Sequence, residues 1–161
     1  MPKKVVLNVL MRFVVILNAA KMSITTKKGD GGRSNYFEKR VSKGGKILEA
    51  VGTLDELQAV LGLVGLEKSQ NDIYEIMGRK EMGERIKELE EEIINLEEEV
   101  VVGNKFVIFK KEKALKLNWA RTIARRAERK VVAAKVFDKN SVIYLNRLSD
   151  FIYLLALKAE R

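Results

Sequence analysis

The sequence of 161 residues contains no cysteine and no histidine. Zinc, haem and iron–sulfur sites that depend on thiolate or imidazole ligands are therefore excluded, as are Cys nucleophiles and Ser-His-Asp triads. We predict no resident metal site in this chain. An enzyme with this composition has to work with Arg, Lys, Asp, Glu, Ser, Thr, Asn, Tyr and backbone amides. These groups are better suited to binding phosphate than to moving protons.

Proline and aromatic residues are also scarce, at one proline and 7% aromatics, whereas Leu, Ile, Val, Ala, Glu, Lys and Arg fill long stretches. This composition favours helices. Apolar residues recur at helical spacing in segments 48–66, 71–77, 84–100, 113–136 and 141–158. Short polar breaks at 68–72, 102–105 and 138–141 separate these segments. The sequence predicts an all-α protein, an up-and-down bundle in a single domain at residues 22–161.

The first 21 residues differ from the rest. Residues 5–20 are apolar, but Arg12 and two asparagines interrupt them, and the stretch is too short to span a bilayer. Three interpretations remain open: a mis-assigned start with Met22 as the initiator, an additional packed helix or strand, and a targeting segment.

The net charge of +9 is distributed unevenly. Residues 61–104 carry 12 acidic and 5 basic side chains, whereas residues 105–161 carry 15 basic and 5 acidic ones. The basic part attracts anions such as nucleotides, nucleic acid or an anionic membrane surface. The alternative interpretation is a set of solvated, salt-bridged helix faces.

Residues 26–34 form a cationic, glycine-rich loop, Thr26-Lys27-Lys28-Gly29-Asp30-Gly31-Gly32-Arg33-Ser34. Glycines permit positive φ angles and bring amide N–H groups close to a ligand, and such amides bind anions together with Lys, Arg, Ser and Thr side chains. The loop lacks the Gly-x-x-x-x-Gly-Lys-Ser/Thr pattern of a Walker A motif. It predicts either a phosphate-binding loop or a flexible surface turn.

Residues 121–129 contain four arginines, of which Arg121, Arg125 and Arg129 lie within about 80° of one another on a helix, with Glu128 beside Arg121. Their charges repel one another unless an anion or carboxylates share this face. A bound polyanion, a salt-bridged face and nucleic-acid backbone binding are all compatible with the pattern. Base-stacking aromatics are scarce nearby, Trp119 being the exception, which disfavours nucleic acid.

Two further polar patches lie on predicted helices. Asn146 and Asp150 share a face at i, i+4, and we expect them to project into the bundle. Asp55 and Glu56 lie near a predicted helix start, where the helix dipole favours carboxylates. Neither patch identifies a function alone.

Taken in order, these four motifs resemble those of the PduO-type ATP:cob(I)alamin adenosyltransferases (corrinoid adenosyltransferases). The matching segments are 26–34, 50–57, 120–129 and 144–150, and 70–78 resembles the second-helix segment of the family. The resemblance covers about residues 22–158 and disfavours a targeting role for the first 21. It implies a five-helix, ferritin-like bundle that forms a homotrimer in the cytoplasm, with ATP and a corrinoid bound between neighbouring subunits.

The implied reaction transfers the 5′-deoxyadenosyl group of ATP to cob(I)alamin and gives adenosylcobalamin and triphosphate. Mg²⁺ would accompany the nucleotide, and a downstream adenosylcobalamin-dependent enzyme is an implied partner, whereas nucleic acid and membranes are not. Cob(I)alamin is itself a strong nucleophile, so the reaction needs no His or Cys.

The resemblance also assigns roles to residues. The triphosphate would be bound by the first loop together with Lys43. The loop residues that would contact it are Thr26, Lys27, Gly29, Asp30, Gly32 and Ser34. ATP would be held from the helices by Arg125, Arg126, Glu128, Arg129 and Asn146. Asp55 would pair across the subunit interface with Arg125 or Arg129, and these three are the predicted catalytic residues. Arg121 would be structural or interfacial. Phe106 or Phe109 would pack near the lower face of the cobalamin, with Phe106 preferred.

One segment departs from the family pattern. Phe106-Val-Ile-Phe109 is followed by Lys110 and Lys111, where the family usually has a Pro-Gly-Gly turn. This difference leaves open a non-catalytic, ATP-binding relative. A basic helical nucleic-acid-binding protein is the second alternative.

Overall fold

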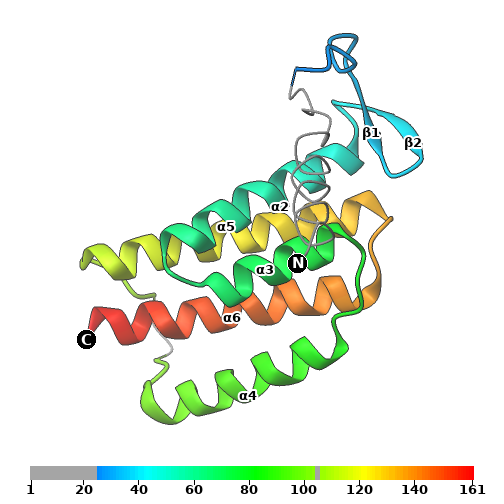
Figure 1. The fold of residues 1–161 in the computed structure, drawn as a ribbon. Helices are drawn as coiled ribbons and strands as arrows, with labels where there is room; N and C mark the ends of the chain where they lie inside the picture. Colours follow the sequence, from blue (N-terminus) through cyan, green and yellow to red (C-terminus); the bar gives the residue numbers. More distant parts are fainter. Residues whose placement is uncertain (1–24, 104–105) are drawn as a thin grey trace, which may run out of the picture. The chain divides into compact units, whose positions relative to one another are not determined.

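The computed structural model describes residues 25–103 and 106–161 (Figure 1). Our predictions for residues 1–21 lie outside these ranges. The chain divides into two compact units, residues 1–33 and 34–161, and the second contains all the described helices. None of the helices in the described ranges is both long and apolar enough to cross a membrane.

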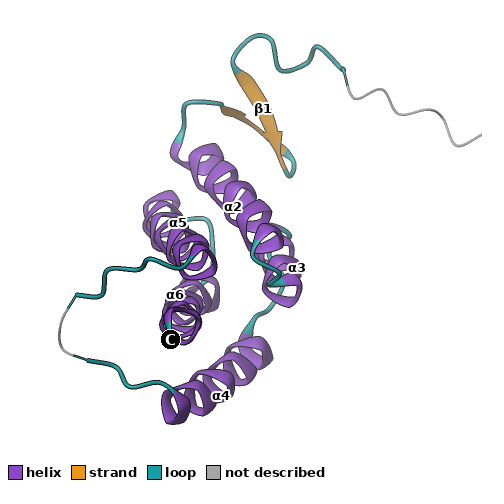
Figure 2. Cartoon of the chain, turned by 90° about the vertical axis from the view of Figure 1, so that its left-hand side faces the viewer, coloured by secondary structure: helices purple, strands orange, loops and turns teal. Residues whose placement is uncertain are grey.

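Helices dominate the described chain, which confirms the predicted fold class. They are α2 (Lys46–Leu63), α3 (Glu67–Met77), α4 (Gly83–Glu99), α5 (Glu112–Ala134) and α6 (Lys139–Glu160). Neighbouring helices pack in the order α3, α2, α5, α6 and α4. Figure 2, which looks almost along the helices, shows α5 and α6 side by side, with α2 and α4 on different sides of this pair.

The helix α5 buries mainly alanines, at positions 114, 120, 124 and 127. Small side chains let the α5 backbone approach α2 and α6 closely, while larger residues of α6, including Leu145, Leu148 and Ile152, fill the remaining space. Arg125, Arg126 and Arg129 of α5 are left exposed.

The predicted break at residues 68–72 is wrong, because this stretch lies within α3. The connection between α2 and α3 comes earlier, at residues 64–66, where Gly65 has a φ of +76°. The N–H of Leu66 donates to the Leu61 carbonyl and that of Gly65 to the Gly62 carbonyl, the pattern of a Schellman motif. A glycine signal, and not polar composition, therefore marks the end of α2. The predicted break at 138–141 is likewise displaced, since Asp138 accepts a hydrogen bond from the Ser141 N–H (2.6 Å) and caps α6.

A short β-hairpin, which the sequence did not predict, precedes the helices. Its strands are β1 (Arg33–Tyr36) and β2 (Lys39–Ser42), which pair in a two-stranded sheet. Ser34, predicted as the end of the glycine-rich loop, therefore lies in a strand. The hairpin escaped the sequence analysis because its strands are short and mostly polar, and its turn contains Phe37 at a φ of +52° rather than a glycine.

Candidate active site

The glycine-rich loop consists of two successive tight turns. The Asp30 N–H donates to the Lys27 carbonyl and the Gly32 N–H to the Gly29 carbonyl, each at 3.2 Å. Lys27 and Gly32 both adopt left-handed conformations, with φ angles of +57° and +71°. Turns of this kind orient consecutive amides toward one side of the loop, and that arrangement suits an anion. Lys43, the other predicted triphosphate ligand, is exposed in the turn between β2 and α2.

The outer face of α5 carries the arginines that the sequence singled out. Arg125, Arg126 and Arg129 are all exposed, and Arg126 forms an ion pair with Glu56 of α2. Among the described residues, Arg125 and Arg129 take part in no ion pair. Two guanidinium groups one helical turn apart thus lack a carboxylate partner, and an anion bound here would relieve their mutual repulsion.

Asn146 of α6 lies next to Glu128 of α5. The Asn146 Nδ2 donates to Glu128 Oε1 (3.3 Å), and Arg147 Nη1 donates to Asn146 Oδ1 (3.0 Å). Arg147 is in turn held by Glu90 of α4 through its Nε, at 2.9 Å. The structure therefore brings together two predicted ATP ligands that are 18 residues apart in sequence. The expectation that Asp150 projects into the bundle is wrong, because its side chain is exposed and pairs with Arg147.

Asp55 and Glu56 lie in the middle of α2, which begins at Lys46. The helix-dipole explanation for these carboxylates is therefore wrong. Asp55 is exposed and accepts a hydrogen bond from Gln58 (3.2 Å). No ion pair joins it to Arg125 or Arg129 among the described residues, and the predicted pairing across a subunit interface stays a prediction.

Arg121 makes contacts that the other three arginines do not make. Its Nε donates to Asn118 Oδ1 (2.9 Å), and its guanidinium lies 5.5 Å from the centre of the Tyr153 ring. This half-buried side chain packs α5 onto α6, which agrees with the structural role expected for it.

The segment between α4 and α5 separates the two candidate phenylalanines. Phe109 is buried and packs edge-to-face on Tyr153, with ring centroids 6.3 Å apart, whereas Phe106 is fully exposed. Val107 and Ile108 are also exposed. Of the two phenylalanines, only Phe106 is accessible to a ligand.

Glu160, near the end of α6, fixes the position of this segment. Its Oε2 accepts hydrogen bonds from the backbone N–H groups of Lys110 (2.9 Å) and Lys111 (3.0 Å), the residues that stand in place of the family's Pro-Gly turn. Glu160 is not among the predicted site residues, because nothing in its local sequence pattern indicates a partner 50 residues away.

These two bonds make the contribution of Glu160 to stability dependent on pH. They lower the pKa of its carboxyl below the ordinary value of 4.5, so the stabilisation is complete above that value and is lost as the pH falls through the lowered pKa. We expect Glu160→Gln to unfold at lower urea concentration than the wild type at about pH 7, and the difference to be smaller at a pH below the ordinary carboxyl pKa of 4.5. Equal differences at both pH values would contradict this account.

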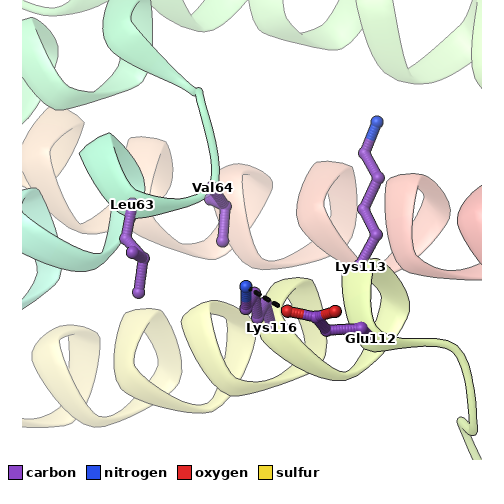
Figure 3. Close-up of a pocket in the computed structure, with 5 residues that line it drawn as sticks. All are labelled: Leu63, Val64, Glu112, Lys113 and Lys116. Carbon is purple, nitrogen blue, oxygen red and sulfur yellow. Dashed lines mark hydrogen bonds and ion pairs between the residues drawn. The ribbon is translucent and has the colours of Figure 1, made fainter.

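A cavity of about 450 Å³ lies where the end of α2 meets the start of α5 (Figure 3). Leu63 and Val64 line one side, and Glu112, Lys113 and Lys116 line the other, with Lys116 paired to Glu112 at 2.6 Å. None of the predicted site residues lies in this cavity. The candidate site is instead the exposed arginine face of α5 together with Glu128 and Asn146.

Comparison with known proteins agrees with this description. The family model for cobalamin adenosyltransferase matches residues 24–159. The corrinoid adenosyltransferase PduO of Salmonella typhimurium is 35% identical over 84% of this chain and 49% of the relative, and the corrinoid adenosyltransferase of Bacillus subtilis is 32% identical over 84% and 85%. The chain therefore belongs to the cobalamin adenosyltransferase family. It spans about half the length of its PduO relatives from Salmonella and Citrobacter.

Solved structures show the same fold. A variant of the PduO-type ATP:corrinoid adenosyltransferase from Lactobacillus reuteri, complexed with ATP, is 27% identical with a TM-score of 0.78, over 85% of this chain and 94% of that one. Another variant of that enzyme, complexed with cobalamin and ATP, is 25% identical with a TM-score of 0.80, over 86% and 93%.

Proposed function

We propose that this chain transfers the 5′-deoxyadenosyl group of ATP to cob(I)alamin, forming adenosylcobalamin and triphosphate. The observation that carries the proposal is the pair Arg125 and Arg129, exposed without a described ion-pair partner beside the Glu128–Asn146 contact, in a member of this family. The relatives in complex with ATP, and with cobalamin and ATP, support the choice of both substrates.

The chemistry requires positioning and charge rather than proton transfer. The cobalt of cob(I)alamin supplies an electron pair to C5′ of ATP, the bond between C5′ and its oxygen breaks, and triphosphate leaves with that bond's electrons. Cobalt is formally oxidised from +1 to +3 as it is alkylated by the C5′ carbon. Negative charge accumulates on the leaving oxygens, where cationic groups and oriented amides stabilise it. Holding both substrates in line can supply about 7–11 kcal/mol of the barrier.

We assign the residues as follows. Residues 26–34 and Lys43 bind the triphosphate, and Arg125, Arg126 and Arg129 neutralise its charge. Glu128 and Asn146 hold the nucleoside part. Among the described residues, no group of three acidic side chains could hold a metal ion, so we place Mg²⁺ on the triphosphate itself. Bound there, the ion would offset charge on the leaving group.

The complete site requires neighbouring subunits in this proposal. Asp55 is exposed on α2, and Arg125 and Arg129 are exposed on α5, so a second copy of the chain can join the two sets. A homotrimer with three such interfaces satisfies this arrangement, and we place it in the cytoplasm, where it would pass adenosylcobalamin to a dependent enzyme. Phe106 and its exposed apolar neighbours supply the surface on which the corrinoid packs.

An anaerobic assay tests the proposal. Protein, Mg-ATP and chemically reduced cobalamin are mixed, and both the cobalamin spectrum and triphosphate release are followed. We expect adenosylcobalamin and triphosphate in equal amounts. Demonstrable ATP binding without adenosylcobalamin would support a non-catalytic relative instead. Binding to nucleic acid that is steeply salt-dependent and indifferent to Mg-ATP would support the other alternative.

A further inference from the structure

The end of α3 has an unusual arrangement of residues. The Lys80 N–H donates to the Glu75 carbonyl and the Arg79 N–H to the Ile76 carbonyl, both at 3.0 Å, which is a Schellman motif. In this motif glycine is favoured at the left-handed position, which is occupied here by Arg79 with a φ of +58°. Gly78 precedes it in an ordinary right-handed conformation. A glycine is thus available one residue away, while an arginine occupies the strained position.

The Arg79 side chain explains this placement. Its guanidinium lies 4.8 Å from the centre of the Tyr36 ring and 4.4 Å from that of Phe37, and its Nε donates to the Tyr36 hydroxyl at 3.3 Å. The two rings meet edge-to-face, with centroids 5.0 Å apart. A planar guanidinium can stack on aromatic faces and donate a hydrogen bond at once, which a lysine ammonium cannot do. We call this set of contacts the Arg79 clasp.

The Arg79 clasp includes Tyr36, whose buried side chain anchors the hairpin. Of residues 33–42, all of which the structure describes, only Tyr36 is buried. A cavity of about 340 Å³ lies beside it, lined by hairpin residues together with Ile47, Arg79 and Val136, so packing under the hairpin is incomplete. Phe37 is itself held at a φ of +52°. Left-handed non-glycine residues persist where the surrounding contacts compensate for their strain, and here two of them meet in one contact.

We propose that Arg79 is a positioning residue for nucleotide binding. It holds the hairpin to the end of α3, and no linker separates the hairpin from the glycine-rich loop, since β1 begins at Arg33 and shares Arg33 and Ser34 with that loop. A fixed hairpin lowers the conformational freedom that the loop loses when it closes on triphosphate. This inference rests on the proposed role of residues 26–34 in binding ATP.

The variant Arg79→Gly separates this role from a merely structural one. Glycine suits the left-handed backbone, so we expect the urea midpoint of the full-length protein to be unchanged or higher. Loss of the clasp should make the amides of residues 34–42 exchange hydrogen about 5-fold to 10-fold faster and raise the KM for ATP by a similar factor. The kcat and the KM for cob(I)alamin should stay at wild-type values.

Three further variants provide comparisons. Arg79→Lys keeps the charge but not the planar stack, and Tyr36→Phe keeps the ring but not the hydroxyl, so both should fall between the wild type and Arg79→Gly. Lys80→Ala removes the neighbouring side chain, which pairs with Glu75 (2.5 Å), and should match the wild type in exchange and KM.

An unchanged KM for ATP in Arg79→Gly would overturn the positioning role, and a lowered urea midpoint with all kinetic constants impaired would reduce Arg79 to a structural residue. If the wild type forms no adenosylcobalamin, the proposed function fails instead. The ATP dissociation constants of the same variants then test the clasp separately.

Discussion

Arg125→Ala is expected to weaken Mg-ATP binding by about 10-fold to 150-fold. This range corresponds to the loss of one charge-assisted phosphate contact, worth roughly 1.5–3 kcal/mol. Arg125 is exposed on α5 and forms no ion pair among the described residues, so its removal leaves no side chain of the same subunit without a partner. The free energy of unfolding should therefore stay close to the wild-type value while turnover falls.

Calorimetric titration with Mg-ATP and the anaerobic assay measure this effect. Lys116→Ala is the matched control, because it also removes a cation from α5. Lys116 is paired with Glu112 and lines the cavity between the end of α2 and the start of α5, where none of the predicted site residues lies. We expect the control to bind ATP as the wild type does. Wild-type affinity and turnover in Arg125→Ala would show that the assignment of this arginine is wrong.

The second large effect concerns stability, in the buried cluster around Asp72. Arg85 donates to both carboxylate oxygens, from Nε at 2.8 Å and from Nη2 at 2.7 Å, and the Tyr144 hydroxyl donates to Oδ2 at 2.6 Å. These contacts join α3, α4 and α6. Burial, reinforced by the charge of Asp72, raises the pKa of Tyr144 far above its ordinary value of 10.0, so the hydroxyl remains a donor at any physiological pH.

Asp72→Ala should lower the free energy of unfolding by about 3–5 kcal/mol, because it leaves the partly buried Arg85 charge without its main partner. This is a large share of the roughly 5–15 kcal/mol that stabilises a typical domain. Urea unfolding at neutral pH measures the change. Tyr144→Phe removes one hydrogen bond and keeps the ion pair, so its cost should be clearly smaller.

Glu84→Gln provides the control for exposed charge. Glu84 pairs with Lys87 at 3.0 Å, and both side chains are more than two-thirds exposed, so solvent screens the pair and its loss should change the free energy of unfolding very little. If Asp72→Ala were as mild as Glu84→Gln, the cluster would not be a stabilising connection between the three helices.

Local pattern was sufficient to predict the helices and their approximate extents. Periodic apolar residues locate α4, α5 and α6 to within a few residues, because a helix that packs on one side needs an apolar stripe with its own period. Polar composition led to the wrong prediction of a break at residues 68–72. Ser69 and Asp72 are polar but buried, and the bonds that Asp72 accepts come from residues of α4 and α6, which no local window contains.

In the candidate site, too, some features could be predicted from the local sequence and others depend on residues of other helices. The sequence identified four arginines at helical spacing, but only the packing of the helices shows which of them have a partner within the described chain. Glu56 of α2 pairs with Arg126, and Tyr153 of α6 stacks with Arg121, while Arg125 and Arg129 remain exposed without a described ion-pair partner. The charge pattern alone could not make this distinction, because the partners lie on other helices.

The absence of Cys and His, the helical periodicity and the order of the motifs could all be read from the sequence, because they depend on composition and on near neighbours. The tertiary structure decided which charges are paired. It also decided that Glu160 holds the segment before α5 and that Arg79 holds the hairpin. Hydrogen bonds and ring contacts of this kind require donors, acceptors and rings within a few ångströms. For residues more than 40 positions apart, folding alone brings them to that distance.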